Sequence, residues 1–359
     1  MCIKLFIMNK LSIGVILLMS IGFFSCETDI DVNAEPTDIT VVYGLIDPVD
    51  TVHYLKINKA FIGEGSALDL AANSSNYTYT DDELNVRLDD GNGMSYLLTR
   101  VTNEVPKEAG IFDSSTNVLY KFTESNINRD ATYTLKIVNT QLDNKEIIAE
   151  TKIVKKSSVS NPLINGAFDV WNGSVSSGGY LSETVTVSAG DNVGRAQVFV
   201  VFNYIEHYTT GAPVEKSVVL NLGEKTTADS PNNELGFLMK GQSFVDNIKA
   251  KVPVPSTVAN FSHRELANVS IEVLSAGTEL STYMEAESPS VTVNQDKPSY
   301  TNIINGIGIF SSRSQFLWVS TRDASNGNLN LNTDTRRLLS SIDLGFCFGT
   351  PGSTTFACP

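Results

Sequence analysis

The side chains in this sequence that could do chemistry are few. Its three histidines, at positions 53, 207 and 263, do not form the His-Glu-x-x-His spacing of a zinc protease. Residues 241–245 lack the final glycine of the Gly-x-Ser-x-Gly turn that exposes a nucleophilic serine. We therefore expect no enzyme, no cofactor and no metal site. A secreted glycan hydrolase stays open as a minor alternative, because its two carboxylates need not be close in the sequence.

Four side chains are candidates for ligand binding: Trp171, Tyr204, His207 and Tyr208. Aromatic faces make efficient contacts with ligands, and the cluster at 204–208, which also contains a glutamate, could recognise a sugar. Each candidate also has an ordinary structural interpretation, because tryptophan packs in protein cores and strand ends commonly carry tyrosine and histidine. Trp171 is the better exposed of the two tryptophans, since Trp318 alternates with Phe316 on one face of a predicted strand.

The four cysteines divide by position. Cys2 lies in the N-terminal leader, and Cys26 directly follows an apolar run. Cys347 and Cys358 bracket a turn-rich loop, and in an exported protein such a pair is expected to form a disulfide. Closing so short a loop stabilises the fold by at most about 3 kcal/mol. Two free thiols are the alternative, and zinc is not expected, since no histidine is near them in the sequence.

Residues 1–25 have the order of a secretory signal peptide. Lys4 and Lys10 precede the apolar run of residues 11–24, and no acidic residue comes before Glu27. As a helix the run would span only about 21 Å, which is shorter than the ~30 Å hydrocarbon core of a membrane. Met8 is a second possible start of the chain. The leader therefore predicts export and does not predict a membrane span.

The end of the leader, residues 23–26, resembles a bacterial lipobox. This resemblance implies that Cys26 is lipidated on sulfur, exposed by cleavage and acylated on its new amine, which anchors the protein stably in a membrane. An ordinary signal peptide with a cleavage site near a cysteine is the alternative. Residues 26–36 form an acidic tether that resembles the signals sending some Bacteroidota lipoproteins to the cell surface, although a solvated linker has the same composition.

Composition limits the remaining function classes. The net charge is −14, and removal of residues 1–25, which hold two lysines and no acid, makes it −16. Clustered basic residues are lacking, so nucleic acid is not expected as a partner. The remaining length is enough for two domains with buried cores. Abundant serine, threonine, asparagine, valine and glycine are typical of short strands joined by turns.

The hydrophobic pattern predicts a mainly β chain. About seven strands between residues 39 and 154 alternate apolar and polar side chains, which favours an immunoglobulin-like β-sandwich over residues 37–156. The turn at 89–93 predicts a hairpin, and it lacks the ligand pattern of a calcium-binding EF-hand loop. A linker at 155–162 leads to a second β-rich domain over residues 163–346, followed by a C-terminal loop at 347–359.

The second domain is expected to combine strands with a few short helices. Helices are predicted at 243–251, 278–287 and 333–341, the last capped by Thr333 or Asp334. Residues 303–310 are strand-like. Gly306 and Gly308 within them permit a bulge or a close backbone approach.

Three segments together resemble an uncharacterised family of Bacteroidota outer-membrane lipoproteins. They are the lipobox, the pair of early strands carrying residues 42–47 and 56–59, and residues 302–312. Members are often encoded beside TonB-dependent receptors. The resemblance implies a non-catalytic protein, anchored through acylated Cys26 on the periplasmic or surface face of the outer membrane, that assists such a receptor in nutrient binding or uptake. A structural or adhesive cell-envelope module is the alternative.

Overall fold

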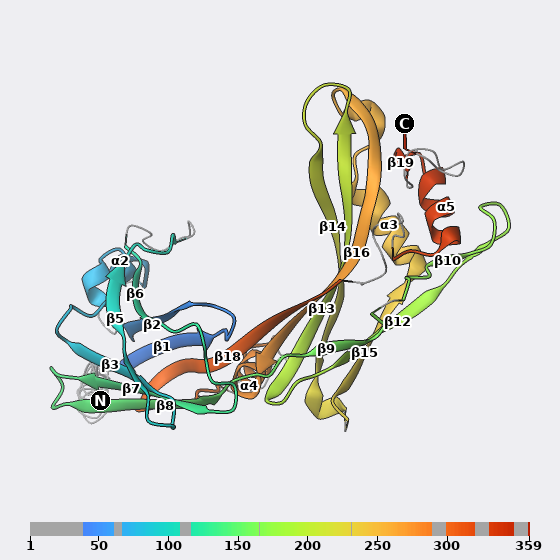
Figure 1. Ribbon diagram of the computed structural model, residues 1–359. Helices are drawn as coiled ribbons and strands as arrows, with labels where there is room; N and C mark the ends of the chain where they lie inside the picture. The colour runs from blue at the N-terminus through green and yellow to red at the C-terminus, as the bar shows by residue number, and fades with distance from the viewer. Residues whose placement is uncertain are drawn as a thin grey trace, which may run out of the picture. The chain divides into compact units, whose positions relative to one another are not determined.

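The computed structural model describes residues 39–60, 67–107, 116–164, 166–230, 232–288, 299–319, 330–347 and 358–359 (Figure 1). Strands account for 51% and helices for 15% of the described residues, which confirms the prediction of a mainly β chain with a few short helices. The leader, Cys26 and the acidic tether lie outside the described residues. Among the residues that are described, no helix is long and apolar enough to cross a membrane.

Two sheets enclose the first hydrophobic core. One sheet contains, in spatial order, β1 (Ile39–Ile46), β2 (Val52–Ala60), β6 (Val118–Thr123) and β5 (Thr99–Thr102). The other contains β8 (Lys145–Lys152), β7 (Thr132–Asn139), β3 (Leu84–Asp89) and β4 (Ser95–Leu97). Alternate side chains of both sheets, such as Leu55 and Ile137, are fully buried in one shared core. Helix α2 (Ala67–Ala71) and 3₁₀ helix η1 (Ser74–Asn76) follow β2.

The predicted hairpin at 89–93 joins β3 and β4, with Asp89 paired to Ser95. The Asp90 carboxylate accepts hydrogen bonds from the backbone N–H groups of Asn92, at 2.8 Å, and Met94, at 2.9 Å. This aspartate therefore holds the turn together, which is the ordinary role of aspartate in such turns.

A late strand, β18 (Gly306–Val319), completes the first core. It pairs in parallel with β1, from Thr40 opposite Gly306 to Ile46 opposite Ser312. β17 (Ile303–Ile304) pairs with β8, and both Ile303 and Phe310 are buried in the first core. Residues 303–312, expected within the domain at 163–346, thus lie beside strands of the first core. Strand partners so distant in sequence leave no signal in the local pattern.

The second core lies between the other half of the same nine-stranded sheet, a three-stranded sheet and two helices. In one sheet β14 (Val214–Thr226), β13 (Val193–Tyr208), β16 (Phe261–Gly277) and β18 are successive neighbours, and β19 (Phe346–Cys347) also pairs with β16. The other sheet consists of β15 (Glu234–Lys240), β12 (Ser182–Ser188) and β9 (Ser158–Asn161). Helices α3 (Gly241–Lys251) and α5 (Thr333–Ser341) contribute Phe244 and Leu339 to this core.

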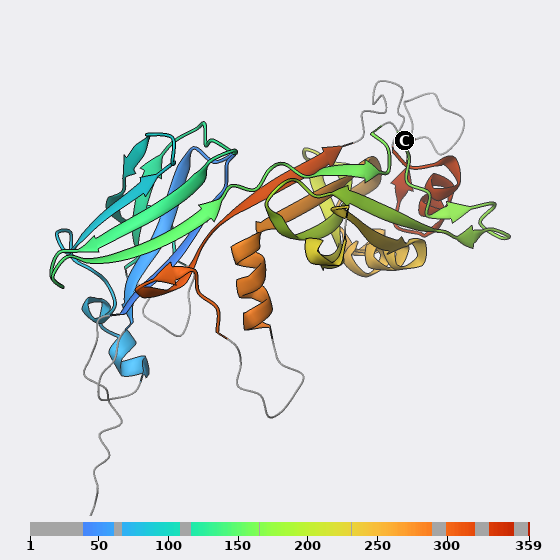
Figure 2. The same ribbon diagram turned by 90° about the horizontal axis from the view of Figure 1, so that it is seen from below.

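Strand β18 thus contributes to both cores, with Phe310 in the first and Trp318 in the second. Figure 2 shows β18 as one continuous ribbon, and its second half pairs with β16 from Arg313 opposite Ala276 to Val319 opposite Ser270. Small elements complete the described chain: α4 (Thr278–Glu287), η2 (Thr227–Asp229), η3 (Pro255–Thr257), β10 (Trp171–Asn172) and β11 (Gly179–Tyr180).

The helix predictions are accurate, with one correction at a cap. Helices α4 and α5 have the predicted bounds, and α3 begins two residues before its predicted start. The residue that caps α5 is Asn332, whose Oδ1 accepts a hydrogen bond from the Thr335 N–H at 2.7 Å. Thr333 and Asp334 instead lie in the first helical turn, where an acidic side chain interacts favourably with the helix dipole.

Candidate functional site

The ends of β13, β14 and β16 bring together three of the four predicted ligand-binding residues. In the antiparallel pairing of β13 with β16, Glu206 lies opposite Arg264, and His207 lies opposite His263. Because successive side chains of a strand point to opposite faces, the core face carries Glu206 and Arg264 while the outer face carries the two histidines. The strand ends therefore hold two separate groups, which we call the ionic cluster and the histidine pair.

The ionic cluster consists of Glu206, Tyr208, Lys216 and Arg264. The side chains of Glu206 and Arg264 are both fully buried, and Arg264 Nε donates to Glu206 Oε2 at 2.8 Å. The Tyr208 hydroxyl donates to Glu206 Oε1 at 2.6 Å, and the Lys216 ammonium donates to the same oxygen. Arg264 also donates to the backbone carbonyl of Leu344. A carboxylate with this many donors is held rigidly in place.

Electrostatics make Glu206 a structural anion. Burial by itself raises the pKa of its carboxyl group, but hydrogen bonds from Lys216, Tyr208 and Arg264, with the charge of Arg264, lower it to about 2. A general acid or base works best when its pKa is near the operating pH. Glu206 stays ionised at neutral pH, so it suits fixing the strand ends and does not suit proton transfer.

The histidine pair occupies the outer face. The imidazole rings of His207 and His263 are stacked, with centroids 4.3 Å apart and planes 8° from parallel. His207 Nε2 lies 3.1 Å from Glu265 Oε2, and His263 Nδ1 lies 3.0 Å from Ser262 Oγ. Burial, and next the charge of His207, lower the pKa of His263, although Glu265 acts in the opposite direction. Lowering this pKa favours the neutral imidazole, which can accept a proton or bind a metal ion.

A hydrolase mechanism is not assembled from these groups. A serine–histidine–acid triad needs the carboxylate on the same imidazole that activates the serine. Here Ser262 lies beside His263, whereas Glu265 bonds to His207. The third histidine, His53, is a core residue that bonds to the Glu124 carbonyl and stacks on Phe122.

A shallow pocket of about 370 Å³ lies next to the histidine pair on the same strands. It is lined by Asn203, Tyr204, Ile205, Glu215, Lys216, Ser217, Ala267 and Asn268. The register of β13 against β16 shifts between Asn203 and Tyr204, which leaves Ala267 without a partner in the ladder. Such a bulge bends the strand locally and re-aims its side chains. Asn203 Nδ2 donates to Asn268 Oδ1 at 2.9 Å, so the two amides fix one another.

The pocket offers amide, hydroxyl and charged groups to a ligand. This donor and acceptor set fits a polar molecule rich in hydroxyl or amide groups. Tyr204 borders the pocket but is only 3% exposed, so it presents no free aromatic face, whereas Tyr208 is partly exposed and its hydroxyl donates to Glu206. Asn203, Asn268 and Lys216 were not predicted from the sequence, although an asparagine in the middle of an apolar strand is a signal that could have indicated the first two.

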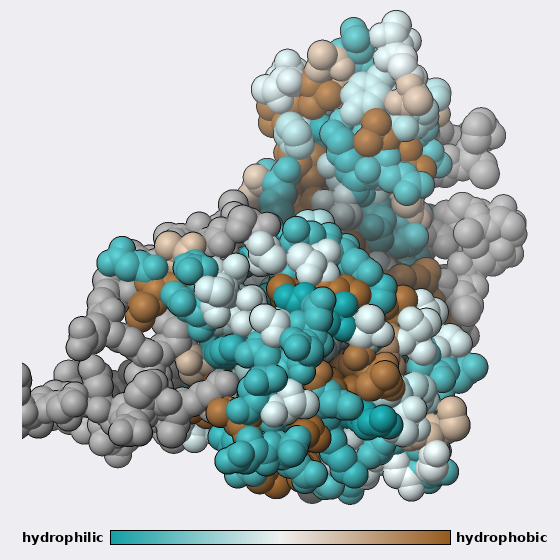
Figure 3. Space-filling view, turned by 90° about the vertical axis from the view of Figure 1, so that its left-hand side faces the viewer, coloured by the Kyte–Doolittle hydropathy of each residue, from teal (hydrophilic) through white to brown (hydrophobic). Residues whose placement is uncertain are grey.

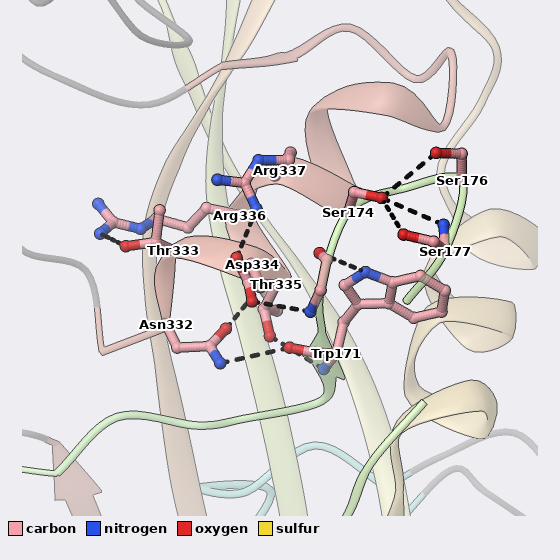
Figure 4. A network of polar contacts seen from close by, with 11 residues as sticks. Trp171, Ser174, Ser176, Ser177, Asn332, Thr333, Asp334, Thr335, Arg336 and Arg337 are labelled. Carbon is pink, nitrogen blue, oxygen red and sulfur yellow. Dashed lines mark hydrogen bonds and ion pairs between the residues drawn. The ribbon is translucent and has the colours of Figure 1, made fainter. Parts of the chain in front are cut away.

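Trp171, one of the candidates for ligand binding, is a buried packing residue in the structure. Its side chain is 8% exposed, its Nε1 donates to the Gly173 carbonyl at 3.1 Å, and its ring packs edge-on against Tyr180. The start of α5 holds this segment, because Thr335 Oγ1 accepts from the Trp171 N–H and Asp334 Oδ2 accepts from the Gly173 N–H (Figure 4). Trp171 therefore anchors the β10–β11 hairpin to the helix.

Cys347 and Cys358 form a disulfide in the structure. Cys347 belongs to β19, which pairs in parallel with β16 and places Cys347 opposite Glu265. The disulfide therefore lies beside β16, the strand that carries His263, near the end of β16 that borders the pocket.

The wider surface is largely polar on the face shown in Figure 3. Hydrophilic residues dominate the described part of this face, and hydrophobic residues form small groups among them.

Comparisons with models of known protein families and with curated proteins returned no match to this chain. The family resemblance, with the role it implies, stays a prediction.

Proposed function

We propose that this chain is a lipid-anchored outer-membrane protein that binds a polar nutrient and assists a TonB-dependent receptor, without catalysing a reaction. The observation that carries the proposal is the pocket on β13, β14 and β16, where polar side chains surround a hollow and one of them, Lys216, donates to the buried Glu206. A rigid polar pocket is suited to recognition, since its hydrogen-bonding groups are already in position.

The expected location of the protein supports this role. The leader and Cys26 predict export and lipid attachment, and a disulfide such as Cys347–Cys358 is typical of proteins outside the reducing cytoplasm. An accessory protein needs both a place beside the receptor and a surface that binds. The lipid anchor would provide the first and the pocket the second.

We also propose that the first sandwich is immunoglobulin-like. Its strand orders, β1-β2-β6-β5 and β4-β3-β7-β8, match the A-B-E-D and C′-C-F-G orders of that class when the eight strands are lettered in sequence. Strand β18, parallel to β1, is an addition to that order.

A pocket variant tests the binding role. Asn203→Ala with Asn268→Ala removes two polar walls, and Asn85→Ala, at an exposed position on β3, is the control. We expect tagged wild type and the control to co-purify a TonB-dependent receptor from native membranes and to support growth on one nutrient. The pocket variant should keep the receptor and lose at least tenfold in nutrient affinity.

Two results would contradict the proposal. One is a wild-type protein that brings down no receptor, and the other is a pocket variant that supports growth as well as the control. If deletion of the protein abolished cell attachment and left growth on the nutrient intact, the structural or adhesive alternative would be favoured. Anchorage has its own test, because a metabolic fatty-acid label should mark wild type and should not mark Cys26→Ala.

A further inference from the structure

The tertiary structure places a histidine beside the C-terminal disulfide. A ligand nitrogen of His263 and the sulfur atoms of Cys347 and Cys358 all lie within 4.8 Å of one another. In the sequence, His263 is more than 80 residues from both cysteines. The parallel pairing of β19 with β16 brings them together, and the Arg264 N–H donates to the Gly345 carbonyl at 2.8 Å beside them.

We propose that reduction of this disulfide creates a binding site for a thiophilic cation such as Zn²⁺, with Cys347, Cys358 and His263 as ligands. Two thiolates and one imidazole are a ligand set that zinc uses in proteins, with water in the fourth position. While the disulfide is intact both sulfurs are committed to each other, so the site is closed. Metal binding here is therefore controlled by the redox state of the cysteines.

The chemistry requires a dithiol reductant. Its two thiols supply two electrons and two protons, the Cys347–Cys358 bond breaks, and the reductant leaves as its own disulfide. Zn²⁺ then displaces one proton from each cysteine thiol to solvent, and two metal–sulfur bonds and one metal–nitrogen bond form. Cys358 and His263 are partly exposed, so both a reductant and a cation can reach this corner.

The distances require only small movements. Zinc bonds of about 2.3 Å to sulfur and about 2.0 Å to nitrogen place tetrahedral ligand atoms roughly 3.5–3.8 Å apart. The present separations are at most 4.8 Å, and the two sulfurs move apart once their bond is reduced. Adjustments of about 1–2 Å are within the reach of side-chain rotation at a partly exposed position.

Contacts other than the disulfide also hold the segment that carries Cys347. Its neighbour Phe346 is buried in the second core, with its ring 5.4 Å from that of Phe202 and 5.5 Å from that of Tyr204. Arg264, which is fully buried, donates to the Leu344 carbonyl on the same segment. Reduction would therefore leave Cys347 beside His263, which is the condition for a site that opens without unfolding.

His207 provides a matched control. Its ring is stacked on that of His263 and lies on the same face, but its Nε2 is bonded to Glu265. His207 does not belong to the group of three ligand atoms within 4.8 Å. Replacing either histidine removes the stacking, and only replacement of His263 removes a proposed ligand.

Cobalt titration of the full chain in detergent tests the site, because Co²⁺ bound by thiolates has a charge-transfer absorption. We expect the absorption after reduction, saturating at one Co²⁺ per chain and displaced by Zn²⁺, and no absorption before reduction. His263→Ala and the more conservative His263→Gln should lower the affinity of the reduced chain for Zn²⁺ at least tenfold. His207→Ala should change it less than twofold, and Cys358→Ser should lower it at least a hundredfold.

Several outcomes would overturn the proposal. Equal affinity of reduced wild type and both His263 variants would remove the histidine as a ligand. Equal absorption before and after reduction would show that the metal is bound elsewhere. Loss of the near-ultraviolet circular dichroism of wild type on reduction would mean that no folded site forms.

Discussion

Replacing Glu206 by glutamine tests the buried ionic cluster. The substitution keeps the shape of the side chain and removes its charge, which leaves the fully buried Arg264 without a charged partner. Breaking a buried ion pair by removing one partner costs about 3–5 kcal/mol, because the remaining charge stays in a poorly solvating interior. We expect Glu206→Gln to lower the free energy of unfolding by this amount at pH 7.

The pH dependence gives a second estimate of the same interaction. The pKa of Glu206 is about 2 in the folded chain, below its ordinary value of 4.5. At about 1.4 kcal/mol for each tenfold change in an equilibrium constant, the ionised form contributes about 3 kcal/mol. A depressed carboxyl pKa stabilises the fold fully above pH 4.5, and this stabilisation is lost as the pH falls toward 2.

Urea unfolding of both proteins between pH 7 and pH 2.5 measures these quantities. Glu224→Gln is the control, since Glu224 pairs with Arg195 on the same sheet but is 43% exposed, and an exposed pair contributes less than about 1 kcal/mol. The double variant Glu206→Gln with Arg264→Met should lose less than the sum of the two single losses, because it removes both charges together.

The reasoning would be refuted by a small effect. If Glu206→Gln and Glu224→Gln destabilise equally, the buried pair has no special energetic role. If wild type and Glu206→Gln lose stability in parallel between pH 4.5 and pH 2.5, the low pKa of Glu206 is wrong.

Two further predictions concern the backbone and a second carboxyl group. Gly308→Ala should lower the free energy of unfolding by more than about 4 kcal/mol in urea, because its Cβ would lie 2.0 Å from the Val42 carbonyl oxygen. The control Gly93→Ala, also at positive φ but in open space, should lower it by about 1 kcal/mol. Equal losses would contradict the close approach at Gly308. Burial, with the charge of Asp169, raises the pKa of Glu183 from 4.5 to about 7, so this group costs the fold stability progressively between pH 4.5 and 7, and the full cost is present above pH 7. Glu183→Gln should raise the melting temperature at pH 8, by about 2–4 °C per kcal/mol, and leave it nearly unchanged at about pH 3.5, below the ordinary pKa; an equal change at both pH values would contradict the shift.

Local patterns predicted the elements of this fold well. Alternation of apolar and polar residues found strands such as β1 and β7, and the three helices were placed nearly residue by residue. These features depend on neighbours within a few positions, where the period of the side chains shows which face is buried. The cap of α5 was missed by one residue, since Asn332, Thr333 and Asp334 are all competent caps and only the backbone conformation distinguishes them.

The candidate site was predicted only in part. His207 and Tyr208 were recognised as members of one strand end, whereas the sequence left ligand binding and core packing as alternatives for Trp171. Its burial depends on contacts with α5, more than 160 residues away in the chain. Pairing across such distances follows from the packing of whole sheets, which no local spacing records.

The sequence by itself determined the expected leader, the mainly β class and the length and position of most strands and helices, because these follow from local hydrophobic period and residue type. The tertiary structure decided which strands became neighbours. It placed β18 beside both β1 and β16, put Glu206 against Arg264 in the interior, and brought His263 to the disulfide. The physical reason is that register and sheet order are set by the burial of complete faces, so residues remote in sequence acquire their chemistry only when those faces meet.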